Sequence, residues 1–164
     1  MSADEPILTR SSFRRLHPLS APHPLSLPPA RIWSDADWQI IRRGYQARDM
    51  DEKWNVFTEG DEVFLHRSWT GNGVFVATFT PAEGGGRRIT RALVERDPAR
   101  QRSTDDDHDR LMLELVLSAI VLGEPATELR AALVEARDTQ GATDAAAIQH
   151  SLLGLRTPSG QAPA

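Results

Sequence analysis

The chain has 164 residues, enough for one domain with a substantial core and too few for two comfortable ones. Its hydrophobic and charged fractions, 40% and 26%, are ordinary for a globular protein, and a net charge of −4 argues against nucleic acid and anionic membranes as partners. The absence of cysteine excludes a disulfide framework, a cysteine-ligated zinc and a thiol nucleophile. We therefore expect a cytoplasmic protein.

The N-terminal segment, residues 1–30, holds six of the eleven prolines. Proline lacks an N–H group and has a fixed φ, so this segment is expected to form neither a helix nor a central strand. We predict a flexible arm, although the leucines between the prolines leave open an extended segment that packs along the domain or a partner. A single domain over 31–156 and a flexible tail over 157–164 complete the predicted organisation.

The first regular element is predicted to be a helix over 35–47. Ser34 and Asp37 have the spacing of a capping box, in which each side chain bonds the other residue's backbone N–H. Apolar residues then recur at spacings of three and four from Trp38 to Tyr45, which places them on one face of a helix.

Four runs with a period of two follow the helix: "KWNVFT", "EVFLHRSW", "GVFVATFT" and "RRITRALVER". Short stretches rich in glycine, asparagine and acidic residues separate them, and such connections favour antiparallel neighbours. This pattern predicts a contiguous antiparallel meander over residues 53–96, with turns near residues 60, 72 and 84.

The last third of the chain is predicted to be helical. Thr104 and Asp107 have capping-box spacing at the start of a helix that runs to Leu122, and the acidic run "DDDHD" suits the positive end of that helix better than a metal site. Two weaker helical stripes follow, near residues 129–136 and 143–156. The predicted fold is α+β: an N-terminal helix, a four-stranded antiparallel meander, and a C-terminal cap of two or three helices.

Chemically versatile side chains concentrate in residues 48–73, where a helix-to-strand connection leads into a hairpin. Neighbouring strands bring residues that are distant along the chain close together. The familiar catalytic and phosphate-binding signatures are absent, so we assign no catalytic residue and expect neither a cofactor nor a metal. The candidate ligand-binding residues are Lys53, Trp54, His66, Arg67, Ser68 and Trp69.

Arg67 is the central residue of this set. Strand alternation places it on the side of Leu65 and Trp69, where a guanidinium without an anionic partner would be costly. A structural interpretation makes the two tryptophans core residues and gives Arg67 an internal acid. A functional interpretation gives it an anionic ligand, since an arginine beside an indole suits a phosphate joined to a planar base. The candidate acids are Asp49, Asp51 and Glu52.

The neighbours of Arg67 on the same strand are predicted to face the other way. His66 and Ser68 alternate with Arg67, so a regular strand directs them to the opposite side of the sheet. A single site that uses both His66 and Arg67 would need a bulge near Gly71.

The stretch "MDEKWNVFTEGDEVFLHRSWTGNGVF", residues 50–75, resembles a block in small, poorly characterised bacterial domains. Some of these domains stand alone, and others accompany ADP-ribosylglycohydrolase or macrodomain-like enzymes. The resemblance covers this block only, and it implies a role connected with ADP-ribose or NAD.

Three classes of function remain open from the sequence. The first is a small binding or accessory module whose ligand the sequence does not identify, with a link to ADP-ribose or NAD metabolism and a nucleotide-like small molecule as one candidate ligand. The second is an enzyme or sensor that acts on a nucleotide-like anion. The third is an interaction or immunity-type module that recognises a protein partner through its proline-rich arm.

Overall fold

A computed structural model of the chain describes residues 6–100, 105–138, 153–154 and 156. The described chain is α+β, as predicted, and its sheet is antiparallel. The elements are η1 (Arg10–Ser12), β1 (Pro22–Pro24), β2 (Ile32–Trp33), α1 (Asp35–Arg43), β3 (Trp54–Glu59), β4 (Glu62–Arg67), β5 (Gly73–Pro81), β6 (Arg87–Glu95), α2 (Asp106–Leu115), η2 (Val116–Val121) and α3 (Thr127–Asp138).

Strands β3 to β6 form the predicted meander, with each strand antiparallel to the next. Glycines with positive φ stand in its turns at Gly60, Gly71 and Gly84. The prediction of four strands is nevertheless wrong, because the sheet has six. Both extra strands, β1 and β2, pair with β6 and come from the segment before α1.

The helices also differ in placement from the prediction. Helix α1 begins at the predicted capping box of Ser34 and Asp37, but it ends at Arg43 because Gly44 turns the chain with φ of 84°. Helix α1 follows two strands, so it is not the first regular element. The predicted helix near 143–156 falls largely outside the described residues.

The long C-terminal helix is capped by Asp105, whose side chain accepts hydrogen bonds from the backbone N–H groups of Asp107 and His108. The predicted cap, Thr104, lies outside the described residues. After Leu115 the helix widens into the π-helical turn η2, in which the N–H of Leu122 donates to the carbonyl of Leu117.

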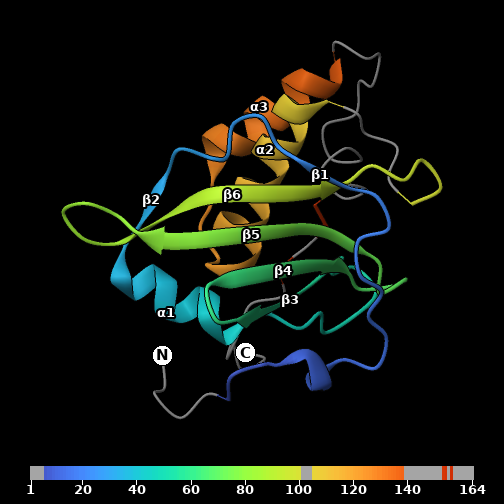
Figure 1. Ribbon diagram of the computed structural model, residues 1–164. Helices are drawn as coiled ribbons and strands as arrows, with labels where there is room; N and C mark the ends of the chain where they lie inside the picture. The colour runs from blue at the N-terminus through green and yellow to red at the C-terminus, as the bar shows by residue number, and fades with distance from the viewer. Residues whose placement is uncertain (1–5, 101–104, 139–152, 155, 157–164) are drawn as a thin grey trace, which may run out of the picture.

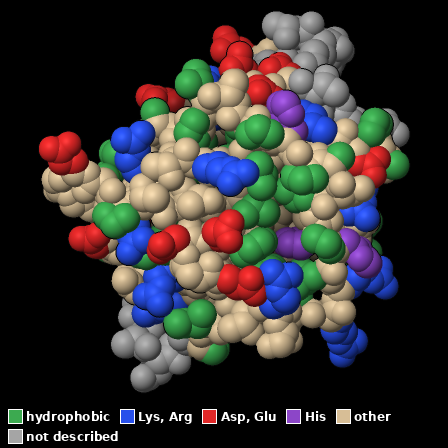
Figure 2. Space-filling model, in the orientation of Figure 1, with side chains coloured by type: hydrophobic (Ala, Val, Ile, Leu, Met, Phe, Trp, Pro, Cys, Tyr) green, Lys and Arg blue, Asp and Glu red, His purple; other side chains and the backbone are tan. Residues whose placement is uncertain are grey.

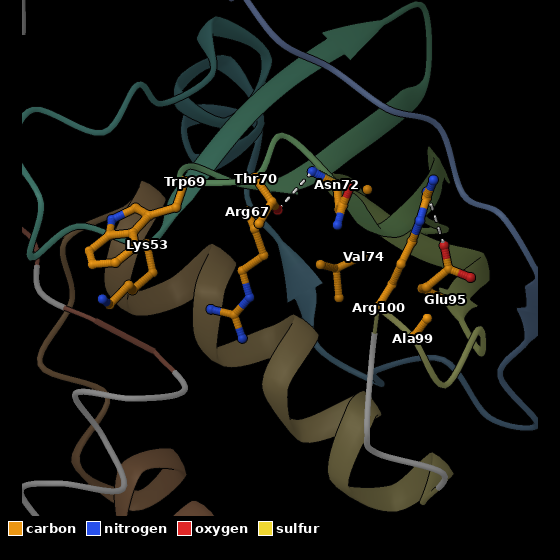
Figure 3. A pocket seen from close by; sticks show the side chains of 10 residues that line it. Lys53, Arg67, Trp69, Thr70, Asn72, Val74, Glu95, Ala99 and Arg100 are labelled. Carbon is orange, nitrogen blue, oxygen red and sulfur yellow. Dashed lines mark hydrogen bonds and ion pairs between the residues drawn. The ribbon is translucent and has the colours of Figure 1, made fainter.

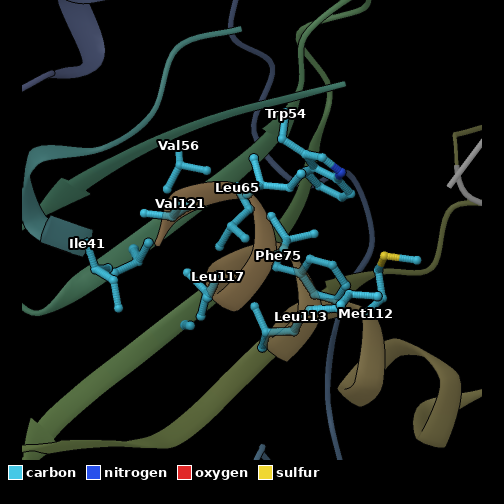
Figure 4. Close-up of a cluster of buried hydrophobic side chains, with 14 of the residues drawn as sticks. Ile41, Trp54, Val56, Leu65, Phe75, Met112, Leu113, Leu117 and Val121 are labelled. Atoms are coloured by element: carbon cyan, nitrogen blue, oxygen red, sulfur yellow. The ribbon is translucent and has the colours of Figure 1, made fainter. Parts of the chain in front are cut away.

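The core lies between the sheet and the helical segment α2–η2 (Figure 4). Leu113 and Leu117 are one helical turn apart and both are 0% exposed, so they face the sheet together. They pack against inward-facing strand residues that include Leu65 and Phe75, which are also 0% exposed. In Figure 1 the helices α2 and α3 lie behind the sheet, and we call the side that faces the viewer the outer face.

Residues 6–30 of the N-terminal segment lie along the outer face and the edge of the sheet. The N–H of His17 donates to the carbonyl of Gly71, and the N–H of Gly73 donates back to the carbonyl of His17. Leu25, at 7% exposure, belongs to the core. Over residues 6–30 the structure has the extended alternative, in which the segment packs along the domain. Its proline-rich strand β1 is an edge strand, which avoids the hydrogen bond that proline cannot donate.

The contact between the N-terminal segment and the β4–β5 turn predicts a large cost for Gly71→Ala. Gly71 has φ of 77°, and an added Cβ would come within 2.5 Å of the Arg15 carbonyl oxygen. Gly60→Ala is the matched control, since Gly60 has φ of 62° but nothing within 4 Å of the added atom. Both variants carry about 1–2 kcal/mol of backbone strain, and Gly71→Ala should lose at least about 1 kcal/mol more. Equal losses in urea denaturation would contradict this contact.

Candidate functional site

A pocket of about 390 Å³ opens on the helix side of the sheet, where β4 turns into β5 (Figure 3). We call it the cationic pocket because three basic side chains line it, within a protein whose net charge is −4. Three of its lining residues, Lys53, Arg67 and Trp69, belong to the set of ligand-binding residues predicted from the sequence. Its lining residues are Lys53, Arg67, Trp69, Thr70, Asn72, Gly73, Val74, Glu95, Ala99 and Arg100.

Arg67 occupies the inner part of this pocket. Its partner across the β3–β4 ladder is Trp54, and its guanidinium lies over the Trp54 ring, 4.3 Å from the ring centroid. Burial lowers the pKa of Arg67 to about 10, so the group stays charged at pH 7. The indole beneath the guanidinium is that of Trp54, and Trp69, which the sequence placed beside Arg67, lines the same pocket.

Trp69 and Lys53 form the outer part of the pocket. The ammonium nitrogen of Lys53 lies 4.1 Å from the centroid of the Trp69 ring, a cation–π contact. The indole N–H donates to the backbone oxygen of Met50 at 3.1 Å, which fixes the orientation of the ring. Trp69 is nevertheless 56% exposed, so the interpretation of Trp69 as a core residue is wrong. Trp54, at 0% exposure, is a core residue as that interpretation stated.

The third cation, Arg100, lies beside a buried acid. Glu95 is 0% exposed, and Arg100 comes within 3.8 Å of its carboxylate and donates to the carbonyl of Pro18 at 2.9 Å. Although burial opposes ionisation, backbone N–H groups of Ser20, Ala21 and Asp97 hold the pKa of Glu95 below its usual range. Neither Glu95 nor Arg100 is among the residues predicted from the sequence, because no local motif marks either of them.

Two of the acids expected to pair with Arg67 accept hydrogen bonds from other groups in the structure. The Glu52 carboxylate, 0% exposed, accepts hydrogen bonds from the Tyr45 hydroxyl at 2.7 Å and from the Arg48 N–H at 3.1 Å. The Asp49 carboxylate accepts from the backbone N–H of Asp51 at 2.9 Å. The pairing of Arg67 with Asp49, Asp51 or Glu52 stays a prediction.

His66 and Ser68 do not line the cationic pocket. His66 lies on the outer face, where its Nδ1 is 2.9 Å from the carbonyl oxygen of Gly71. A bulge does interrupt the β4–β5 ladder between Leu65 and His66, but it does not bring His66 to the side of Arg67. The hydroxyl of Ser68 donates to the backbone oxygen of Glu52 at 2.8 Å, which fixes the start of the turn.

The acidic run at residues 105–109 has a structural role. Asp105 caps α2, and the carboxylates of Asp106 and Asp109 bind the guanidinium of Arg96. Within the described ranges, no three histidine or acidic side chains are grouped as metal ligands.

Comparisons of the chain with family models, with curated proteins and with solved structures gave no match. None of the helices in the described part of the chain combines the length and the apolar character that crossing a bilayer requires.

Proposed function

We propose that this protein is a small binding module for a nucleotide-like anion, with ADP-ribose and NAD as the first ligands to test. The observation that carries the proposal is the grouping of Lys53 and Arg67 with the exposed indole of Trp69 in one pocket. The choice of ADP-ribose and NAD rests on the resemblance of residues 50–75 to domains that accompany ADP-ribose enzymes.

The chemistry of the pocket suits a phosphate joined to a planar ring. A guanidinium binds phosphate oxygens through two parallel hydrogen bonds, and an ammonium adds a compact charge. A bound anion would also offset the desolvation that lowers the pKa of Arg67 to about 10. The exposed ring of Trp69 offers a stacking surface for a base, and a volume of about 390 Å³ is within the range of small-molecule sites.

The same geometry favours binding over catalysis. Among the described lining residues, Glu95 is the only carboxylate, and three backbone N–H groups already bond its oxygens. The nearest histidine along the chain, His66, lies on the outer face and is not among the lining residues. An enzyme acting on a nucleotide-like anion is therefore the second candidate, favoured only by the pocket's charge. A protein-interaction module is the third.

A ligand that binds this pocket is expected to raise the melting temperature of the full chain. At a ligand concentration of 100 times Kd the gain is about 2.7 kcal/mol, or roughly 5–10 °C for a chain of this size. ADP-ribose, NAD, AMP and inorganic phosphate are tested separately by thermal shift. Trp69→Ala and Arg67→Met should abolish the shift, whereas Arg10→Met, at an ion pair outside the pocket, should retain it.

The outcomes separate the three classes of function. A stable ligand that raises the melting temperature supports a binding module, and a ligand converted to product in the same sample identifies an enzyme. The binding proposal is wrong if none of the four ligands shifts the melting curve of the wild type, or if the two pocket variants respond as the wild type does.

A further inference from the structure

A second cavity, of about 300 Å³, lies on the outer face between the N-terminal segment and strands β4 to β6. We call it the outer cavity. Figure 2 views this face and shows hydrophobic side chains gathered near its middle, beside histidine side chains. The lining residues that matter here are Pro18, Leu19, Phe64, His66, Val76 and Leu93.

The walls of the outer cavity are mainly apolar. Phe64, Val76 and Leu93 are successive partners across three strands, so their side chains form one row on the outer face. The Phe64 ring is stacked on Phe57, with centroids 5.0 Å apart and planes 8° from parallel. Leu19 and Pro18 of the N-terminal segment face this row from the other side. The cavity therefore suits a flat apolar molecule.

One buried polar side chain lines these walls. His66 is 3% exposed, and its Nδ1 bonds the carbonyl oxygen of Gly71 at 2.9 Å. A carbonyl can only accept a hydrogen bond, so Nδ1 carries the proton. Burial lowers the pKa of His66, so the ring is neutral at pH 7 and Nε2 keeps an acceptor lone pair. No described residue donates a hydrogen bond to Nε2.

Charged groups at the rim disfavour an anionic occupant. Glu62 borders the cavity, and a bound anion would be repelled by its carboxylate. Arg10 also borders it, but both ends of its guanidinium fork bond the Glu59 carboxylate, at 2.9 and 2.8 Å. The volume is at the lower end of the range for ligand sites, which limits the occupant to about one or two rings.

We propose that the outer cavity binds a small, uncharged aromatic molecule with one hydroxyl or N–H group, such as a phenol, and that this group donates to Nε2 of His66. The site is distinct from the cationic pocket, because it lies on the opposite side of β4, although Gly73 borders both. The proposal does not depend on the nucleotide proposal, and either can fail alone.

The test is an NMR titration of the full chain at pH 7 with phenol and, separately, with toluene, which lacks the hydroxyl. Phenol should bind more tightly than toluene by roughly 2- to 12-fold, the range expected for one net hydrogen bond. The imidazole nitrogen resonances report the acceptor directly, and the Nε2 resonance of His66 should move with phenol and stay in place with toluene. Equal affinities, or an unmoved Nε2 resonance, would overturn the role of His66.

Three variants locate the site. Val76→Phe fills the outer cavity and leaves the bond between His66 and Gly71 untouched, so it should weaken phenol binding at least about tenfold. Thr80→Phe, on the same strand and outside the lining, is the matched control and should bind as the wild type does. His66→Phe should remove the advantage of phenol over toluene. Phenol binding that survives Val76→Phe, or no binding to the wild type at millimolar phenol, would refute the site.

Discussion

A variant lacking residues 1–24 is expected to lose at least about 3 kcal/mol of unfolding free energy, which lowers its melting temperature by roughly 6–12 °C. The deletion removes the pairing of β1 with β6 and two of the N–H donors to the buried Glu95 carboxylate. It also uncovers the stacked rings of Phe57 and Phe64 on the outer face. Thermal unfolding followed by circular dichroism measures the loss.

The control for this deletion removes residues 1–6 only. The first backbone contact of the segment described in the structure is the N–H of Leu8 bonding the carbonyl of Arg43, and the control keeps it. Its melting temperature should stay within about 2 °C of the wild type. If the longer deletion also stays within that range, the segment is the flexible arm that its proline content predicts, and the contacts described here contribute nothing to stability.

Sequence patterns predicted the elements whose signals are local. The meander from β3 to β6 follows from alternation and from glycine turns, and the start of α1 follows from Ser34 and Asp37. In contrast, β1 and β2 are three and two residues long, too short for any period to show. Their pairing depends on β6, which lies more than fifty residues further along the chain. The number of strands therefore could not be predicted from local sequence patterns.

The candidate site was likewise predictable only where local strand alternation determines which way a side chain points. Alternation correctly separated His66 from Arg67, which the structure places on opposite sides of β4. The same alternation suggested that Trp69 is buried, but β4 ends at Arg67 and the turn directs Trp69 outward. Arg100 and Glu95 are held at the cationic pocket by contacts with the N-terminal segment. Such long-range contacts cannot be predicted from the residues that flank Arg100 and Glu95 in the sequence.

The largest single-residue effect is expected at Arg96, whose guanidinium binds the carboxylates of Asp106 and Asp109. Burial by itself would lower the pKa of Arg96, but the hydrogen bonds to these two carboxylates outweigh it, so the pKa is raised. The Asp109 side chain is only 1% exposed, so Arg96→Met would remove a bound guanidinium from a carboxylate in the core. Losing one partner of a buried pair costs about 3–5 kcal/mol, which urea denaturation at pH 7 would measure as a lower unfolding free energy.

Arg10→Met is the matched control, because Arg10 forms a similar fork with Glu59 at the surface, where the two side chains are 51% and 45% exposed. Exposed pairs contribute about 0–1 kcal/mol, so this variant should unfold nearly as the wild type does. The double variant Arg96→Met/Asp109→Leu removes the stranded charge together with its partner, and it should recover most of the stability lost in Arg96→Met. If the double variant is no more stable than Arg96→Met, the loss comes from disrupted packing around β6 and α2. The buried carboxylate would then not be its cause, because removing that charge would have changed nothing.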